Sequence, residues 1–346
     1  MKKWKAAAAV VLTIVLLSFT LTGCSMPQKD DSTFSVTMVT SDGGINDQSF
    51  NQSSWEGLQK FAEETGSEVR YIESKQPSDY LTNLDRATDS YPDLIWGIGY
   101  TFADPILTIA KANPDMSFAI VDNAYDDTPF NVTGVVFRAE ESSFMAGYIA
   151  GMSTKTDKVG YVGGMKSAIN DQFQYGYDAG VAYAAKERGV KIEVMNQLVE
   201  SYTDAAKAKA IANKMFSQGA DIVFHSAGGA GQGVIESAKD NGKYAIGVDR
   251  DQSYLAPDNV LTSALKNVDT AVELVCQEKM DGQDIGGQTL SFGLSDDAVG
   301  IPTENKNMDP EVYEKAMEVR QKIISGEIKV PATEEAYNAY VASLGQ

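Results

Sequence analysis

The strongest constraint on the fold is an alternation of strand-like and helix-like segments along most of the 346 residues. The apolar run at 34–41 predicts a strand. The segment 50–66 predicts a helix, with Trp55, Leu58 and Phe61 on one face. Repeated strand–helix order is typical of parallel sheets joined by crossover helices.

Two successive units share this pattern. In the first unit we expect strands at 34–41, 68–74, 93–100, 117–123 and 132–137, and helices at 50–66, from Ser78 onward and at 103–114. In the second unit we expect strands at 158–165, 191–199, 221–229 and 244–252, and helices at 172–189, 204–219 and 231–242. The chain therefore predicts two similar, doubly wound α/β domains.

The remaining segments are expected to cross between these domains. A strand at 259–266, a helix at 267–280 and a strand at 288–294 follow the second unit. We expect a hinge of three crossings near Gly151, Ser263 and Gln288. The resulting domains are 34–151 plus 264–287 at the N-terminal side and 152–263 plus 288–346 at the C-terminal side. A ligand held between them should favour a closed state.

The first residues have the composition of a secretory signal. Three lysines precede an apolar run that ends in small residues, so residues 1–23 are predicted to be a signal peptide. The motif LTGC resembles a bacterial lipobox, which would make Cys24 a lipidated N-terminus. Residues 24–33 then form a polar tether. An uncleaved membrane anchor is the alternative.

Charge and cysteine content exclude several classes of site. Removing the signal peptide leaves 26 basic and 48 acidic residues, a formal charge of −22, which disfavours nucleic acid as a partner. If Cys24 is lipidated, Cys276 has no disulfide partner and is expected to be a small core residue. His225 is the one histidine, so a zinc site or a catalytic triad is improbable. We expect no metal and no cofactor.

Polar and glycine-rich motifs follow the predicted strands. The stretch SDGGINDQSFN at 41–51 combines glycines, acids and amides, and similar motifs end the strands at 100, 123, 165, 229 and 252. Ligands of doubly wound sheets bind beyond the carboxyl ends of the strands. These loops therefore predict a cleft between the two domains.

The motifs also carry a family resemblance. GGINDQSFNQSSWEG, VDN, EESSFMAGYIAG, KVGYVGGM, GADIVFHSAGGAGQGV and AIGVDRDQ together resemble the BMP family of basic-membrane-protein-like lipoproteins, which includes purine nucleoside receptors. The resemblance covers about Phe34 to Gly326. It implies a type I periplasmic-binding-protein fold and a receptor that passes nucleosides to an ABC permease.

The resemblance also implies roles for individual residues. Phe50 would be one ring that stacks on the base, and Asp122 would read the base edge. Tyr202 is the preferred second ring, with Phe173 as the competitor. The remaining expected ligand residues are Gly228, Asp249 and Lys266 at the ribose, with Asp42, Asp47 and Asn51 in the same shell.

These residue types suit a nucleoside. Aromatic rings stack on a flat base, and a carboxylate can accept hydrogen bonds from both hydroxyls of a ribose diol. Each residue also has a structural alternative: Phe50 could anchor the helix at 50–66, Asp122 and Asp249 could cap strand ends, and His225 is expected to be a partly buried strand residue. The glycines at 228–233 do not match a dinucleotide-binding motif.

The sequence therefore predicts a non-enzymatic, monomeric, lipid-anchored binding protein on the extracytoplasmic face of the cell membrane. Its expected partners are a nucleoside, with a purine nucleoside favoured, and an ABC permease. The alternatives are a receptor of the same fold for a sugar or an autoinducer, or an exported nucleoside hydrolase. Hydrolysis is disfavoured because SDGGIND lacks the dense acidic cluster that would hold calcium.

Overall fold

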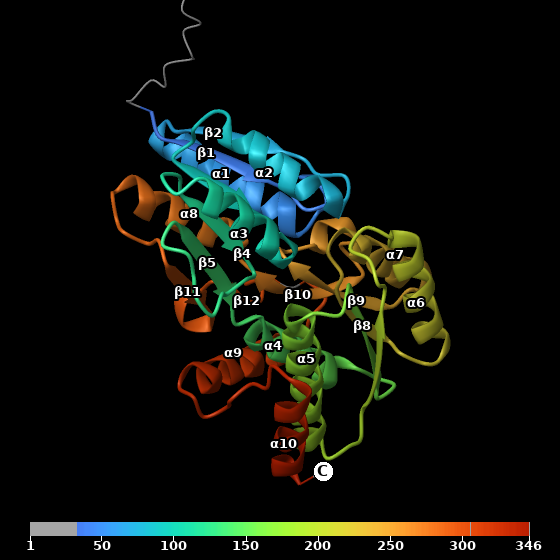
Figure 1. The fold of residues 1–346 in the computed structure, drawn as a ribbon. Helices are drawn as coiled ribbons and strands as arrows, with labels where there is room; N and C mark the ends of the chain where they lie inside the picture. Colours follow the sequence, from blue (N-terminus) through green and yellow to red (C-terminus); the bar gives the residue numbers. More distant parts are fainter. Residues whose placement is uncertain (1–32, 305, 346) are drawn as a thin grey trace, which may run out of the picture. The chain divides into compact units, whose positions relative to one another are not determined.

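The structure, a computed structural model, describes residues 33–304 and 306–345, which form one compact unit. The predicted signal peptide, Cys24 and all of the tether except residue 33 lie outside the described residues. No helix in the described part of the chain is both long enough and apolar enough to span a membrane. Two six-stranded sheets with flanking helices organise the fold (Figure 1).

The first sheet has the strand order β11-β5-β4-β3-β1-β2, and all its neighbouring strands are parallel. Its strands are β1 (Ser35–Val39), β2 (Glu68–Ile72), β3 (Leu94–Gly97), β4 (Phe118–Val121), β5 (Val132–Phe137) and β11 (Gln288–Phe292). The helices that connect or pack with these strands are α1 (Phe50–Thr65), α2 (Tyr80–Thr88), α3 (Ala103–Ala112) and α8 (Val268–Met280). We call this assembly the first lobe.

The second sheet repeats the arrangement in the order β12-β10-β9-β8-β6-β7. Its strands are β6 (Lys158–Gly163), β7 (Glu193–Leu198), β8 (Ile222–Ser226), β9 (Tyr244–Asp249), β10 (Val260–Lys266) and β12 (Val299–Gly300), of which β12 is antiparallel to β10. The other helices are α4 (Ala139–Ser153), α5 (Ala168–Arg188), α6 (Ala205–Ser217), α7 (Gln232–Asn241), α9 (Pro310–Ile324) and α10 (Glu334–Leu344). We call the assembly on this sheet the second lobe. The expected type of fold, two doubly wound α/β sheets, is confirmed.

Three connections join the two sheets, but two of them differ from the expected positions. The first runs through α4, which ends just after Gly151. The second follows β10, because Ser263 lies inside that strand and the chain leaves the second sheet only after Lys266. The third follows β11, which pairs with β5 and so begins at Gln288 in the first sheet. The assignments of 264–266 to the N-terminal side and of 288–292 to the C-terminal side are therefore wrong. The remaining domain boundaries stay a prediction.

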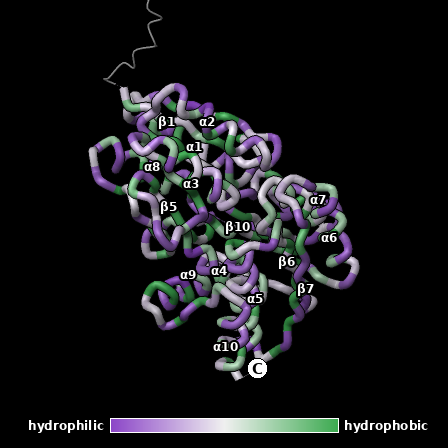
Figure 2. Tube along the Cα trace, in the orientation of Figure 1, coloured by the Kyte–Doolittle hydropathy of each residue, from purple (hydrophilic) through white to green (hydrophobic). Residues whose placement is uncertain are grey.

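Buried apolar side chains link the two sheets. One cluster extends from Met38 and Trp96 in the first sheet, through Phe144 on α4, to Tyr161 and Phe224 in the second sheet. In Figure 2 the hydrophobic colour follows strands such as β5 and β6, while the connecting loops are largely hydrophilic. The lobes are thus joined by packed core as well as by chain connections.

The predicted core role of Cys276 is confirmed. Its side chain is completely buried on α8, and Trp96 Nε1 donates a hydrogen bond to its Sγ over 3.4 Å. Burial raises the pKa of the Cys276 thiol to about 12. The thiol therefore stays protonated and unreactive at neutral pH.

Close packing of α4 on α5 depends on glycines. A Cβ added at Gly147 would lie 2.1 Å from the carbonyl oxygen of Tyr177, and one at Gly180 would lie 2.1 Å from that of Phe144. The obstructing atoms belong to the helix backbones, which cannot rotate away as a side chain could. These two helices therefore approach each other where neither carries a side chain.

Gly147→Ala is expected to destabilise the protein by about 1–3 kcal/mol, because the two helices must separate to admit the methyl group. Gly300→Ala is the matched control, since a Cβ there meets no atom within 4 Å. Chemical denaturation of both variants measures the difference. Equal stability of the two would contradict this account of the helix interface.

Candidate functional site

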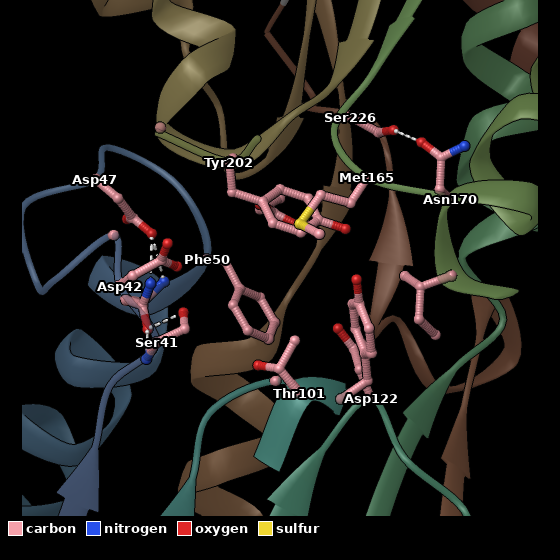
Figure 3. A pocket seen from close by; sticks show the side chains of 18 of the residues that line it. Ser41, Asp42, Asp47, Phe50, Thr101, Asp122, Met165, Asn170, Tyr202 and Ser226 are labelled. Atoms are coloured by element: carbon pink, nitrogen blue, oxygen red, sulfur yellow. Dashed lines mark hydrogen bonds between the residues drawn. The ribbon is translucent and has the colours of Figure 1, made fainter. Parts of the chain in front are cut away.

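A pocket lies beyond the carboxyl ends of strands from both sheets (Figure 3). The β1–α1 loop (residues 40–49) and the segments after β3 and β4 line it from the first lobe. The second lobe contributes the segments after β6, β7 and β8, the start of α5 and the ends of β9 and β10. All ten residues expected in the cleft line this one pocket: Asp42, Asp47, Phe50, Asn51, Asp122, Phe173, Tyr202, Gly228, Asp249 and Lys266.

Two aspartates occupy equivalent places in the two sheets. Asp122 directly follows β4, and Asp249 ends β9, the strand at the same position in the second sheet. Both have left-handed backbones, with φ of 65° for Asp122 and 64° for Asp249. This conformation is uncommon for residues other than glycine, although aspartate tolerates it better than most. In each lobe it turns the chain sharply at the strand end and leaves a buried carboxylate at the pocket.

Lys266 neutralises part of this negative charge. It is 2% exposed, and its Nζ lies 2.6 Å from Asp122 Oδ2, so the ion pair bridges the two lobes. The same Nζ lies 4.6 Å from the centre of the Phe50 ring, within range of a cation–π interaction. Asp122 Oδ1 is buried and has no hydrogen-bond partner. This oxygen is available to accept a hydrogen bond from a ligand.

Asp249 has a different environment. Its Oδ2 accepts a hydrogen bond from Ser49 Oγ of the first lobe. Burial raises the pKa of Asp249 to about 6, against the opposing effects of Lys266 and of the Ser49 hydrogen bond. The carboxylate is therefore ionised at neutral pH but sensitive to mild acid.

Two of the expected ligand residues mainly hold the β1–α1 loop together. Asp47 accepts four hydrogen bonds, from the amides of Ser49, Asn51 and Gln52 and from the Asn51 side chain. Asn51 Oδ1 accepts from the amide and the hydroxyl of Ser41. A carboxylate has about four acceptor positions, so Asp47 is already saturated at the start of α1. The side chains of Asp47 and Asn51 therefore form part of the pocket wall.

The three aromatic candidates differ in exposure. Phe50 and Tyr202 are partly exposed, and Figure 3 shows both rings projecting into the pocket, from the start of α1 and from the loop after β7 respectively. Phe173 is 4% exposed, and its ring lies 6.3 Å from that of Phe224 in the core. Phe173 therefore forms part of the pocket floor and of the core at once.

Several lining residues are absent from the sequence-based set. They are Ser41, Gly43, Pro77, Tyr80, Gly99, Tyr100, Thr101, Met165, Ile169, Asn170, Ser226, Gly229 and Val248. Most lie at the end of a strand or in the loop after it, so the rule that ligands bind beyond strand ends could have found them. Pro77 and Tyr80 precede or begin α2, and Ile169 and Asn170 lie on α5, where no such signal exists. Among the described lining residues, Lys266 is the sole lysine or arginine.

His225 is not part of the pocket lining. It lies in β8 and is completely buried, whereas partial burial was expected. Burial lowers its pKa to about 4, so the imidazole is neutral at physiological pH. In the described ranges, no group of three or more His, Cys, Asp or Glu residues could hold a metal ion.

Comparison with known proteins agrees with this architecture. The family model described as "ABC transporter substrate-binding protein PnrA-like" matches residues 34–334. The CD4+ T-cell-stimulating antigen of Listeria monocytogenes is 40% identical, over 94% of this chain and 99% of the relative. Basic membrane protein A of Borreliella burgdorferi is 38% identical, over 96% and 98%. A crystal structure of an ABC transporter solute-binding protein from Aeropyrum pernix superposes with a TM-score of 0.81 at 26% identity, over 90% of this chain and 97% of that one.

Proposed function

Because the chain belongs to the PnrA-like family of ABC transporter substrate-binding proteins, we propose that it captures nucleosides in this pocket for import by a permease. Proteins of this family bind a ligand and carry out no reaction on it. The observation that best supports a nucleoside is the combination of two partly exposed aromatic rings with two buried carboxylates on opposite lobes. The aromatic rings suit a base, and the carboxylates suit the hydroxyls of a ribose.

The base would stack between Phe50 and Tyr202. We prefer Tyr202 to Phe173 as the second ring because Phe173 already packs in the core. Stacking of a base on an aromatic ring contributes roughly 1–3 kcal/mol and tolerates different bases. The unpartnered Asp122 Oδ1 would then accept a hydrogen bond from an N–H group on the base edge.

The ribose would lie against the second lobe. Asp249 can accept hydrogen bonds from the diol, and the backbone at Gly228 and Gly229 can approach closely because no side chain intervenes. Lys266 limits the repulsion between Asp122 and Asp249, and Asp42 completes the acidic wall. Since these residues come from both lobes, the ligand would favour the closed arrangement.

This arrangement predicts discrimination against phosphate. The pocket gathers four aspartates, Asp42, Asp47, Asp122 and Asp249, and its cation Lys266 is already paired. A nucleoside monophosphate would bring its charge into a partly desolvated, acidic site. We expect guanosine to bind and guanosine monophosphate to bind much more weakly, with free guanine weakened by the loss of ribose contacts.

Isothermal titration calorimetry with these three compounds tests the proposal. The free base is the control for the ribose contacts, and the monophosphate is the control for charge. Equal affinity for guanosine and its monophosphate would contradict the proposed role of the aspartates.

We also propose that Cys24 carries a lipid that anchors the protein to the extracytoplasmic face of the membrane. Lys2, Lys3 and Lys5, the apolar run and LTGC support this, as do relatives called basic membrane proteins. Apolar acyl chains would then hold the polar, acidic protein at the bilayer.

Cys24→Ala is expected to move the protein from the membrane fraction to the medium, or to leave an uncleaved precursor. Fractionation and intact-mass measurement of the wild type and the variant distinguish these outcomes. Cys276→Ala is the matched control and should stay at the membrane, because its thiol is buried in the core. Lipid attachment that persists in Cys24→Ala would disprove the anchor assignment.

A further inference from the structure

The β1–α1 loop belongs to the first lobe, yet it is held by the second. The side chain of Gln252, in the segment after β9, donates from Nε2 to the carbonyl oxygen of Gln48 over 2.9 Å. Tyr254 donates from its hydroxyl to Gln48 Oε1 over 2.6 Å. Gln232 Nε2, at the start of α7, lies 3.2 Å from the carbonyl oxygen of Asp47. The loop that supplies Asp42 and leads into Phe50 is therefore fixed from across the pocket.

The orientation of the Gln252 amide follows from its partners. Its Oε1 accepts the backbone N–H of Val248 over 3.0 Å, which identifies that atom as the oxygen. His225 Nε2 lies 3.0 Å from the same oxygen, and an amide oxygen can only accept. His225 must therefore carry its proton on Nε2 and donate it to Gln252. With the oxygen held on two sides, the amide nitrogen can only face Gln48.

The Gln252 amide lies in a buried, closely packed environment. Gln252 and His225 are both completely buried. A Cβ at Gly247 would lie 2.7 Å from Gln252 Oε1, so a side chain at that position would displace the amide. Gln48 has a left-handed backbone with φ of 59°, a conformation that costs free energy in any residue other than glycine and persists only when its surroundings hold it.

We propose that Gln252, oriented by the buried imidazole of His225, is a positioning residue that holds the β1–α1 loop across the pocket. It thereby sets Ser49 against Asp249 and Phe50 beside Lys266. This gives His225 a role that does not require contact with the ligand. The inference rests on the proposed function only for the identity of the ligand, because the loop can be observed without one.

Hydrogen–deuterium exchange of the ligand-free, full-length protein tests the proposal. Gln252→Met keeps the side-chain length and removes the donor to Gln48. We expect the amides of residues 41–52 to exchange about five-fold faster, the effect of losing one typical hydrogen bond, while β8 and β10 keep their protection. Gln283→Met is the matched control at an exposed position in the α8–β11 connection and should change nothing in the loop.

The role of His225 is tested by rescue. His225→Met should raise loop exchange as Gln252→Met does, whereas His225→Gln, which still offers an N–H at the end of its side chain, should restore most of the protection. If His225 only filled space in the core, His225→Met and His225→Gln would raise loop exchange equally. Should Gln252→Met lose protection throughout, Gln252→Glu replaces it at alkaline pH, where the ionised carboxylate still accepts from Val248 and His225 and repels the Gln48 carbonyl.

Unchanged exchange of residues 41–52 in a folded Gln252 variant would overturn the proposal, as would equal exchange in the two His225 variants. Calorimetry with guanosine provides the second readout, and Gln252→Met should weaken binding about five-fold. Wild-type protein that binds no guanosine, with the loop effect intact, would refute the proposed nucleoside function and leave the positioning role standing.

Discussion

Lys266→Met is expected to destabilise the protein by about 3–5 kcal/mol, the cost of leaving a buried charge without its partner. Lys266 and Asp122 are 2% and 7% exposed at their side chains, and their charged groups lie 2.6 Å apart. Methionine would preserve the contacts with the Phe50 ring but leave Asp122 and the nearby Asp249 without a cation. Ligand binding should be lost as well, because the two lobes would no longer be bridged by this pair.

The double variant Lys266→Met/Asp122→Asn separates this effect from a packing defect. Removing both charges should recover most of the lost stability, since a buried pair can often be replaced by neutral groups without loss. Lys60→Met is the matched control: Lys60 pairs with Glu273 over 2.8 Å at the surface, where solvent screens the charges, and its loss should have little effect. Urea denaturation measures all three variants. A Lys266 variant as stable as the Lys60 control would refute the account.

Nucleoside affinity is expected to rise with pH up to about 6 and then to level off. Burial raises the pKa of Asp249 to about 6, and only its ionised form can accept hydrogen bonds from both ribose hydroxyls. Well below this pKa the affinity should fall by about ten-fold per pH unit. The stability of the ligand-free protein should respond in the opposite direction. Because the folded pKa lies above the unfolded value, Asp249 destabilises the fold as pH rises from about 4 to about 6.

Asp249→Ala is expected to weaken guanosine binding by about 2–4 kcal/mol at pH 7.5 and to affect free guanine much less. The same variant should lose the pH dependence of guanosine binding between pH 5 and 7. Calorimetry across this range measures both effects. A pH dependence that survives in Asp249→Ala would assign it to another group and contradict the role of Asp249 at the ribose.

The sequence predicts the elements of this fold well and their long-range pairing less well. Alternating apolar runs locate β1, β3, β6 and β9 within a few residues, because each strand is short and buried. They do not say which sheet β11 joins, since the pairing of Gln288–Phe292 with β5 depends on contacts about 150 residues apart in the chain. Helices α9 and α10, which follow the repeated units, are not expected from the sequence pattern.

In the site, too, local features are predictable from the sequence and long-range contacts are not. The strand ends indicate the segments that contain Asp122 and Asp249, and the family resemblance singles out these two residues together with Phe50 and Lys266. Gln252 is missed because its importance comes from a carbonyl oxygen on the opposite lobe, and a backbone group has no signature in the sequence. Asp47 has a side chain of the type expected for a ligand residue, but its oxygens already accept hydrogen bonds from Ser49, Asn51 and Gln52.

The ligand that the protein selects from a mixture of candidates decides whether the proposed function is correct. The purified full-length protein is incubated with an equimolar mixture of purine and pyrimidine nucleosides, their monophosphates, free bases, ribose, arabinose and glucose, then separated from unbound compounds and denatured. Mass spectrometry of the released small molecules should recover nucleosides, with monophosphates, free bases and sugars near background. Recovery of a sugar or a monophosphate in preference to every nucleoside would contradict the account.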